Sequence, residues 1–531
     1  MKKQPWWQAC TCYQIYLPSF CDGNNDGLGD FPGLISRLDY LQALGIGAVW
    51  ITPFYPSPLV DNGYDISDYC AVDARFGTLD DFRRVVDGCH ARGIRVIIDL
   101  VVNHVSSEHP WFRDAWNNPG SRYRDYFLFR RQPNNWRSFF SGSAWTAEPD
   151  TGEFYYHKFA PGQVDLNWAN PAVEQEIYRV VDFWVTQGVD GFRFDVINFL
   201  TTDGIGPDNP EENGEQRHEF DVNQPRLPET LQRLCAHVRA QGDYFLIGEI
   251  GSEDPDVLSR YQSPQLMDVV FNFNIGSQKN FDVSRLFSQL KTTLAAQSGL
   301  PTLFFSSHDM SRMISRFGEN ERDTGRALAV LALQLTVSGV PFIFQGEELG
   351  VTDYRPQTAE QLFDIQGKTH YRTALAAGSS PQQALALAIE HSRDGSRAPL
   401  PWRDAPFGGF SSVAPWMPVG GDITLINAER QQQDETSFWH QYRQLIALRR
   451  RVAALHQGQQ DSLDLTDECV WFTRSTAEEQ VWIAINFGAP VRNPWQEIEA
   501  EVLYGEDAQW IGKNQCLIKR RVQSANGRAA F

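Results

Sequence analysis

Acidic side chains follow several short apolar stretches of this sequence. The stretch from Gly188 to Val196 reads Gly-Val-Asp-Gly-Phe-Arg-Phe-Asp-Val and places Arg193 and Asp195 at its end. Glu249 ends a second apolar run, and Asp309 follows a third. A single Asp at a strand end typically caps the next helix, but unrelated caps would not be expected to repeat on separate strands. The repetition therefore predicts that these groups converge on one site.

Three carboxyl groups at one site have a specific chemical use. One can attack as a nucleophile, a second can donate and later accept a proton, and a third can stabilise positive charge on a sugar ring in an oxocarbenium-like transition state. We expect Asp195 to be the nucleophile, with Glu249 and Asp309 beside it.

The elements that would position these groups alternate between strand and helix. Continuous apolar strands separated by helical patterns are typical of a parallel sheet that is covered on both faces. Eight such strands predict an α/β fold, a (β/α)8 TIM barrel in which the chemistry lies at the carboxyl ends of the strands. The strands are expected near residues 13, 49, 97, 192, 247, 271, 304 and 342. Helices are expected at 34–44, 79–92, 173–187 and 437–451.

Other segments depart from this alternation. Residues 105–170 are rich in Trp, Asn, Arg, Ser and Gly and predict an inserted, loop-rich domain after the third strand. The barrel would then comprise residues 1–104 and 171–456, with an irregular insertion at about 356–415 that has a helix-like stretch at 382–390. Short alternating strands, such as 469–473 and 480–486, predict a C-terminal antiparallel β-domain over 457–531.

Composition excludes several classes of partner. The chain has 531 residues and a net charge of −19, whereas nucleic acids and anionic membranes attract positive surfaces. The eight cysteines form no CxxC pair and have no regular spacing, so they are expected to be reduced, mostly buried thiols. No run of 18 apolar residues occurs, and no apolar segment follows the basic start of the chain. We expect a cytoplasmic monomer with an uncharged small-molecule substrate.

By four motifs the chain resembles the α-amylase family of glycoside hydrolases along nearly its whole length. The motifs are Asp-Leu-Val-Val-Asn-His at 99–104, Gly-Phe-Arg-Phe-Asp-Val at 191–196, Gly-Glu-Ile at 248–250 and Ser-His-Asp at 307–309. The resemblance implies that Asp195 is the nucleophile, Glu249 the general acid/base and Asp309 the third, transition-state-stabilising carboxylate. We expect Arg193 to hold Asp195 ionised, and the apolar neighbours of Glu249 to retain its proton.

The resemblance also implies a set of substrate-binding residues. His104 and His308 look like the family's donors to sugar hydroxyls. Gln163 begins Gln-Val-Asp-Leu-Asn, which is similar to a signature of the oligo-1,6-glucosidase branch. Asp65 and Arg397 look like the pair that clamps the terminal glucose and closes the pocket. A closed pocket implies an exo-acting enzyme that removes one glucose from a non-reducing end.

The expected activity is that of a retaining α-glucosidase on short α-1,6-linked oligosaccharides of the isomaltose type. Val196 resembles the residue that accompanies α-1,6 preference, where α-1,4 enzymes tend to have Thr. One alternative is a trehalose-6-phosphate hydrolase, for which Lys279 and Lys291 could hold the phosphate. A transglycosylase or isomerase, such as an isomaltulose synthase, would use the same intermediate. A catalytically silent sugar-binding or transporter-associated subunit is the alternative from a different class.

A glycine-rich acidic loop near the start of the chain indicates a cation site. Oxygen ligands at alternate positions suit Ca²⁺, and the loop resembles the calcium loop of this branch, with the Leu28 carbonyl as one ligand. The other ligands would be Asp22, Asn24, Asp26 and Asp30. The loop is not an EF-hand, because Gly33 occupies the twelfth position in place of a bidentate Glu. An Asx-rich turn without an ion is the alternative. A structural calcium ion and no organic cofactor are expected.

Overall fold

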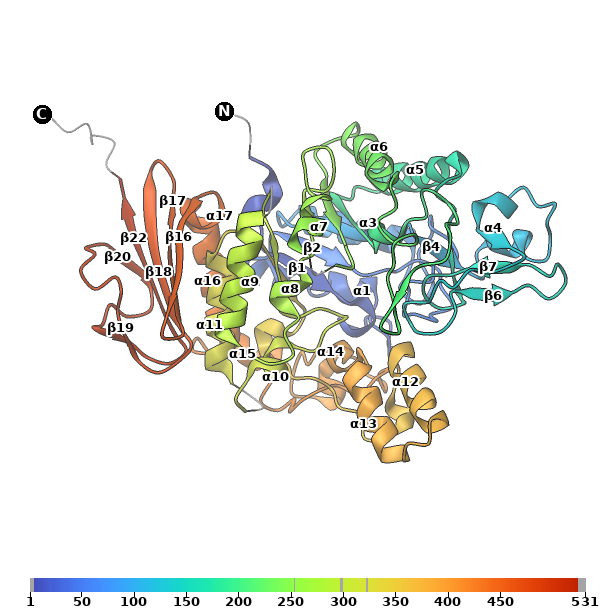
Figure 1. The fold of residues 1–531 in the computed structure, drawn as a ribbon. Helices are drawn as coiled ribbons and strands as arrows, with labels where there is room; N and C mark the ends of the chain where they lie inside the picture. The colour runs from blue at the N-terminus through green and yellow to red at the C-terminus, as the bar shows by residue number, and fades with distance from the viewer. Residues whose placement is uncertain (1–3, 253, 297–298, 321–322, 524–531) are drawn as a thin grey trace, which may run out of the picture.

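A computed structural model describes residues 4–252, 254–296, 299–320 and 323–523. Its centre is a sheet of eight parallel strands, as the sequence predicts, in the order β13-β12-β9-β3-β2-β1-β15-β14. The strands are β1 (Cys12–Ile15), β2 (Ala48–Ile51), β3 (Arg95–Leu100), β9 (Gly191–Phe194), β12 (Phe245–Gly248), β13 (Val269–Val270), β14 (Thr302–Leu303) and β15 (Val340–Phe344). Most of their side chains are buried, because helices cover the outer face of a parallel barrel (Figure 1).

A side chain joins the two end strands of this sheet. The Thr302 hydroxyl on β14 accepts the backbone N–H of Asn272 at 2.9 Å and donates to the carbonyl of Val270 on β13 at 2.9 Å. One hydroxyl thus satisfies both a donor and an acceptor where two very short strands meet. This link closes the barrel.

The outer helices agree with the predicted pattern, with one difference. The predicted helix at 34–44 is two short helices, α1 (Phe31–Ile35) and α2 (Leu38–Leu44). The other principal outer helices are α3 (Leu79–His90), α5 (Pro171–Thr186), α6 (Leu227–Arg239), α9 (Val283–Ala296), α11 (Thr324–Thr336) and α16 (Phe438–Arg451). A capping box between Thr78 and Asp81 starts α3. No helix in the described ranges is long and apolar enough to cross a membrane.

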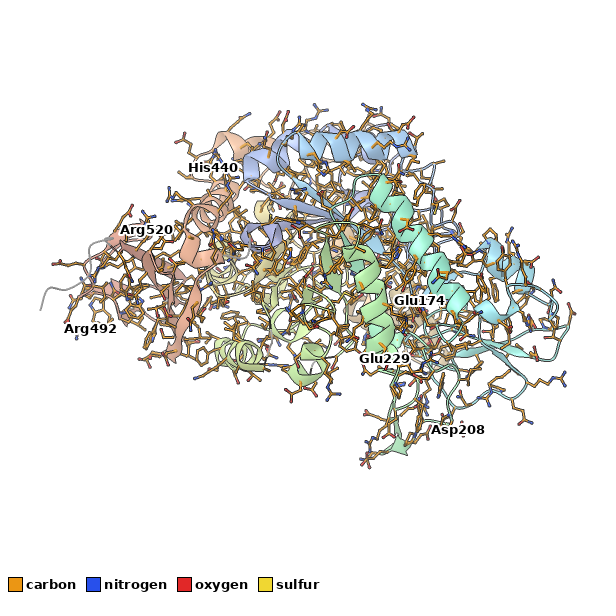
Figure 2. All side chains as sticks on the ribbon, turned by 90° about the horizontal axis from the view of Figure 1, so that it is seen from above. Glu174, Asp208, Glu229, His440, Arg492 and Arg520 are labelled. Carbon is orange, nitrogen blue, oxygen red and sulfur yellow. The ribbon has the colours of Figure 1, made fainter. Side chains whose placement is uncertain are left out.

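The segment after β3 folds back over the carboxyl end of the barrel. It contains β4 (His104–Ser106), α4 (Pro110–Ala115), β5 (Phe129–Arg130), β6 (Trp145–Ala147), β7 (Phe154–Tyr156) and β8 (Gln163–Asp165). β4 pairs with β8 at its base, and β5, β7 and β6 form a small sheet. The hairpin of β10 (Glu211–Glu212) and β11 (Glu215–Gln216) follows the nearby segment at Asp208, which projects from the molecule in Figure 2.

The second insertion is more helical than the sequence predicts. The expected helix at 382–390 is present as α13 (Pro381–His391), but α12 (Ile365–Ala376) precedes it and packs against it. The sequence signal of α12 is weak because few of its side chains are buried. A short helix, α14 (Asp394–Arg397), follows α13 and returns the chain to the barrel.

The C-terminal part is an antiparallel sheet, as expected. Its order is β16-β17-β18-β22-β20, and a small pair, β19-β21, flanks it. The bounds are β16 (Gln459–Thr466), β17 (Cys469–Ser475), β18 (Glu479–Asn486), β19 (Val491–Arg492), β20 (Glu501–Tyr504), β21 (Trp510–Ile511) and β22 (Gln515–Val522). Arg520 on this sheet and Arg492 on the small pair lie at the opposite end of the molecule from Asp208 in Figure 2. All eight cysteines are free thiols, and six of them are buried.

Candidate active site

Strand register brings the first polar groups of the site together. Asp99 on β3 and Arg193 on β9 are partners in the parallel ladder, so their side chains point to the same face. Asp195 directly follows β9, and Glu249 directly follows β12, the next strand of the barrel. Because parallel strands present their carboxyl ends to one rim, the two acids meet there, as the sequence predicts.

Arg193 is the centre of an ion-pair network. Its Nη1 lies 2.7 Å from Asp99 Oδ1 and 2.5 Å from Asp195 Oδ1, and its Nη2 is paired with Glu249. Its side chain is buried, and the ring of Trp50 lies beside its guanidinium. One buried cation is therefore shared among three carboxyl groups.

The environment separates the pKa values of the two acids. Burial raises the pKa of Asp195 to about 6, against the lowering effect of Arg193. Burial raises the pKa of Glu249 to about 8, and the negative charges of Asp195 and Asp309 add to this shift. At neutral pH Asp195 is thus mostly ionised and Glu249 mostly protonated, which suits a nucleophile beside a general acid. The expectation that Arg193 keeps Asp195 ionised holds only near and above neutral pH, because burial has the larger effect.

Asp309 is flanked by two arginines and a histidine. Arg393 Nη1 lies 3.3 Å and Arg397 Nη2 3.0 Å from Asp309 Oδ1, and His308 Nε2 lies 3.2 Å from Oδ2. Burial alone would raise the pKa of Asp309, but His308 and the two arginines lower it well below the usual range of an Asp. Asp309 is therefore a permanent anion, as a carboxylate that stabilises positive charge must be.

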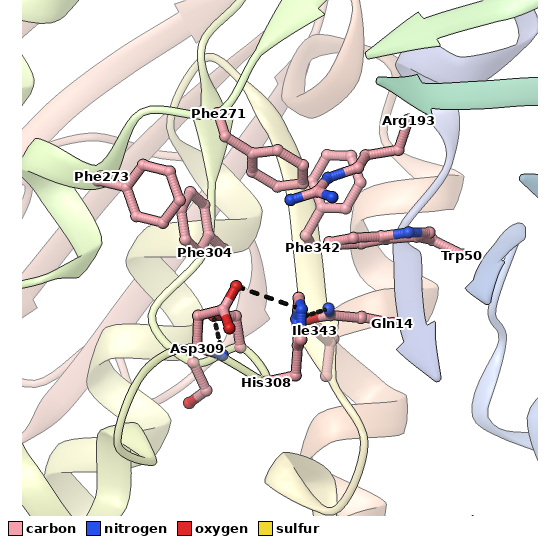
Figure 3. Close-up of a pocket in the computed structure, with 12 residues that line it drawn as sticks. Gln14, Trp50, Arg193, Phe271, Phe273, Phe304, His308, Asp309, Phe342 and Ile343 are labelled. Atoms are coloured by element: carbon pink, nitrogen blue, oxygen red, sulfur yellow. Dashed lines mark hydrogen bonds and ion pairs between the residues drawn. The ribbon is translucent and has the colours of Figure 1, made fainter. Parts of the chain in front are cut away.

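His308 lies under this carboxylate, at a cavity of about 10 Å³ inside the barrel (Figure 3). Its Nδ1 is 2.6 Å from Gln14 Nε2, and its Nε2 is 2.7 Å from the Tyr64 hydroxyl. Burial lowers the pKa of His308 to about 3, so the ring is neutral and can donate one hydrogen bond.

A pocket of about 520 Å³ opens above these groups. Its volume suits a disaccharide-sized molecule. Both ring and polar side chains line it, a composition that fits flat sugar rings with hydroxyl edges. The lining residues are Asp61, Tyr64, His104, Phe139, Phe140, Phe159, Gln163, Asp195, Val196, Phe199, Glu249, Gly251, Ser252, Phe273, Asp309, Gln366 and Arg393.

The pair expected to clamp the sugar is corrected by the structure. Asp65 does not line the pocket: it is fully buried and its carboxylate accepts the backbone N–H groups of Val60 and Asp61. Arg397 lies behind Asp309 and donates to the carbonyl of His308 at 2.7 Å. Their neighbours in sequence, Asp61 and Arg393, line the pocket instead. The Oδ1 atom of Asp61 and the Nη2 atom of Arg393 are 2.6 Å apart.

The sequence predicts Asp65 and Arg397 in place of Asp61 and Arg393 because the two acids are close to each other in sequence, and so are the two arginines. Asp61 and Asp65 stand in one loop, and Arg393 and Arg397 stand one helical turn apart. The stretch Asp61-Asn-Gly-Tyr-Asp65 does not say which of its two acids faces the pocket, since a turn can bond either carboxylate to its own backbone. Only a tertiary contact, the ion pair between Asp61 and Arg393, distinguishes the two acids.

The remaining predicted binding residues lie at the pocket. His104 Nε2 is 2.9 Å from the Tyr64 carbonyl and 3.2 Å from Gln163 Nε2, and Gln163 Nε2 is 3.3 Å from Asp61 Oδ2. Burial lowers the pKa of His104 to about 4. These side chains form one connected polar wall.

Tyr64 was missed in the sequence. Its hydroxyl donates to Asp99 Oδ2 at 2.9 Å, and its ring stacks on His308 with centroids 5.4 Å apart. It connects the Arg193 network to His308 and presents a ring to the pocket. Its place in the loop after β2 gives no hint of this contact.

Val196 has an unusual backbone conformation. Its φ of 39° and ψ of 44° are left-handed, which is strained for a β-branched residue. The conformation turns the chain directly after Asp195 and brings the Val196 N–H to 3.4 Å from Glu249 Oε2. Val196 also lines the pocket, as the linkage prediction requires.

The predicted calcium loop is held together by its own hydrogen bonds. Asp22 accepts the backbone N–H groups of Asn24, Asn25 and Gly27, and Asp30 accepts those of Gly23, Asn24 and Gly33. Asp30 also caps α1. Within the described ranges, no three His, Cys, Asp or Glu side chains are grouped to hold a metal ion. The oxygen donors suit Ca²⁺ chemically, but the loop keeps its shape by itself, and calcium stays a prediction.

Comparison with known proteins finds one matching family and several similar enzymes. A model of the α-amylase catalytic domain matches residues 14–458. The chain is 36% identical to an oligo-1,6-glucosidase of Parageobacillus thermoglucosidasius over 91% of its length and 90% of the relative. It is 37% identical to a trehalose-6-phosphate hydrolase of Escherichia coli, with 92% of both chains covered. The crystal structure of a trehalulose synthase from Pseudomonas mesoacidophila superposes with a TM-score of 0.91 at 33% identity, covering 98% of this chain and 100% of the other.

Proposed function

The chain belongs to the α-amylase family, and we propose that within it the protein is an exo-acting, retaining α-glucosidase that hydrolyses short neutral α-glucosides, preferentially α-1,6-linked. The observation that carries this proposal is the ion pair between Asp61 and Arg393 at the pocket. It joins the loop after β2 to the segment before α14, and in the proposed complex it would block extension of the sugar chain past Asp309. A pocket closed at this point admits the end of a chain, not its middle.

Arg393 is more than a partner of Asp61. Its guanidinium also pairs with Asp309 at 3.3 Å and with Asp364 at 2.5 Å. Burial opposes its charge, but these carboxylates raise the pKa of Arg393 well above its usual value. A rigid, permanently charged group in this position would orient hydroxyls of the terminal glucose against Asp309.

In the proposed reaction Asp195 attacks the anomeric carbon while Glu249 protonates the leaving glycosidic oxygen. The bond between that carbon and oxygen breaks, and a glucosyl ester to Asp195 forms with inverted configuration. Glu249, now ionised, takes a proton from water, whose oxygen displaces Asp195 and restores the original configuration. Asp309 stabilises the positive charge of the sugar ring in both steps.

The charges at the pocket favour a neutral substrate over a phosphorylated one. Arg393 is the one cation among the described residues that line the pocket, and three carboxylates already share it. Lys279 is 80% exposed and pairs with Glu390 at 2.9 Å, and Lys291 lies on α9 outside the pocket lining. A phosphate dianion would lack the convergent cations that it needs.

A transfer reaction is the second candidate, because of the rings around the pocket mouth. Phe139, Phe140, Phe159 and Phe199 form one cluster with centroids 5.6 to 6.3 Å apart. Such a wall can hold the leaving sugar and exclude water, so that a sugar hydroxyl takes the place of water in the second step. Relatives with this chemistry exist, since a trehalulose synthase has been solved with its substrate sucrose.

One assay separates these activities. The purified protein is incubated with isomaltose, maltose, sucrose and trehalose 6-phosphate, and products are identified by chromatography. The proposal expects glucose release from isomaltose at the highest kcat/KM, and no turnover by Asp195→Asn. Conversion of sucrose to an isomeric disaccharide would favour the transfer reaction. Faster cleavage of trehalose 6-phosphate than of isomaltose would refute the neutral-substrate proposal, and no turnover of any sugar would leave the silent binding subunit.

A further inference from the structure

A second hollow lies between the barrel and the C-terminal sheet. Its volume is about 460 Å³, and its walls come from α11, α16 and the segment from β20 to β22. Figure 1 shows this sheet beside α11 and α16, on the other side of the barrel from the first insertion. An adjoining hollow of about 380 Å³ shares Leu328 and Gln441 with it. The two form one trough, and none of the residues lining it lines the catalytic pocket.

An exposed tryptophan lines this trough. Trp510 on β21 keeps 55% of its surface exposed, which is unusual for the largest apolar side chain. Its strand partner is Arg492, so the ring has no apolar neighbour across the ladder. An exposed indole in a hollow of the surface offers a flat face to a ligand.

Amide groups accompany the ring. Gln441 and Gln444 on α16, and Asn514 and Gln515 in the turn before and at the start of β22, all line the same hollow. The Asn514 Oδ1 atom is buried and has no hydrogen-bond partner. Gln441 uses its Oε1 on the Tyr504 hydroxyl at 3.1 Å, which leaves its amide N–H groups to donate. An unmatched acceptor and available donors beside a ring are suited to hydroxyl groups.

The charges that line the trough do not favour an ionic ligand. Glu506 is the one charged side chain among the described residues of the first hollow, and Arg430 and Asp434 offset each other in the second. A neutral molecule with flat apolar faces and hydroxyl edges meets these conditions, whereas a phosphate or an acidic peptide does not.

We propose that the trough is a second carbohydrate-binding site, which holds a chain of α-linked glucose units by stacking on Trp510 while the catalytic pocket acts on a chain end. The ligand class rests on the proposed function, but binding here needs no catalysis. The site would raise the local concentration of long substrates and would not affect short ones.

Native gel electrophoresis through dextran tests this proposal on the full chain. Wild type is expected to be retarded by dextran, and Trp510→Ala to migrate about as in a dextran-free gel, since loss of ring stacking weakens binding about tenfold. Val502→Ala, which changes another exposed apolar side chain, on β20 of the adjacent five-stranded sheet, should be retarded like wild type. Gln444→Ala, which leaves the ring in place, should reduce retardation in part.

Hydrolysis of p-nitrophenyl α-glucoside is the folding control, because kcat/KM for this short substrate should be equal in wild type and Trp510→Ala. A melting curve serves the same purpose if the chain has no hydrolytic activity, so failure of the proposed function remains distinguishable. Equal retardation of wild type and Trp510→Ala, or no retardation of either, would overturn the proposal. So would a wild-type dimer in sedimentation velocity that Trp510→Ala dissociates, because the trough would then be an interface between two copies.

Discussion

The Asp61 carboxylate lies 2.6 Å from the Arg393 guanidinium, although 332 positions separate the two residues in the sequence. Asp65, four positions further along the same loop, contacts the loop's own backbone and does not reach the pocket. The two acids therefore provide a matched pair of variants for the substrate clamp.

Asp61→Asn is expected to reduce kcat/KM for isomaltose about 100-fold, because it leaves Arg393 without one of its buried partners at the sugar. Asp65→Asn should leave kcat/KM within about twofold but lower the melting temperature by about 1 to 3 °C, since an amide N–H2 would face backbone donors. Steady-state kinetics and melting curves on both proteins measure this. A large kinetic effect of Asp65→Asn with none for Asp61→Asn would restore the pair expected from the sequence.

The pH dependence of kcat/KM should be bell-shaped. Activity needs Asp195 ionised, so it should fall below pH about 6, and it needs Glu249 protonated, so it should fall above pH about 8. Asp99→Asn should move the acid limb to lower pH, because the negative charge of Asp99 raises the pKa of Asp195 and competes for Arg193. An acid limb that stays in place or moves upward in Asp99→Asn would contradict the shared-cation model.

Val196→Thr tests the linkage preference. Both residues are β-branched and share the strain of a left-handed backbone, so the exchange changes the chemistry of the pocket wall and not the turn after Asp195. The ratio of kcat/KM for isomaltose over maltose is expected to fall about tenfold. An unchanged ratio, with both substrates still cleaved, would remove Val196 as the determinant of linkage.

Glu347 should make stability fall as pH rises. Burial raises the pKa of Glu347 from 4.5 to about 7, so the folded state binds a proton that the unfolded state has lost. The contribution of Glu347 to the free energy of unfolding does not change below pH about 4.5. Between pH about 4.5 and about 7 this contribution decreases, by at most about 3 kcal/mol. Glu347→Gln keeps an acceptor for the Tyr442 hydroxyl, and its melting temperature should fall less than that of wild type between pH 5 and 8. Equal slopes for the two proteins would show that Glu347 does not titrate in this range.

Calcium is expected to bind the loop at Asp22 to Asp30 without being needed for its shape. Because the carboxylates are already satisfied by backbone N–H groups, a chelator should lower the melting temperature by only about 2 to 4 °C and leave kcat unchanged. Asp26→Asn, in the exposed part of the loop, should abolish the chelator effect. Elemental analysis that finds no calcium in protein purified without chelator would favour the ion-free Asx-rich turn.

The fold of this protein and the position of two of its acids follow from the sequence alone. Largely apolar runs such as Arg95–Leu100 and Gly191–Phe194 predict buried strands, because their length and composition suit a sheet covered on both faces. Their alternation with helices determines a barrel, and the barrel rule brings Asp195 and Glu249 to one rim before any distance is known. The fold and the meeting of these acids needed no more than local pattern and a topological rule.

The tertiary structure decided the rest, because it depends on contacts between distant segments. Which of two neighbouring acids turns into the pocket depends on a partner 332 positions away, and that contact leaves no periodic trace in the chain. The same is true of Tyr64, which joins Asp99 to His308, and of the balance by which burial outweighs Arg193 at Asp195. Sequence specifies which chemical groups are present and on which strand they stand, whereas their pKa values and partners are properties of the assembled environment.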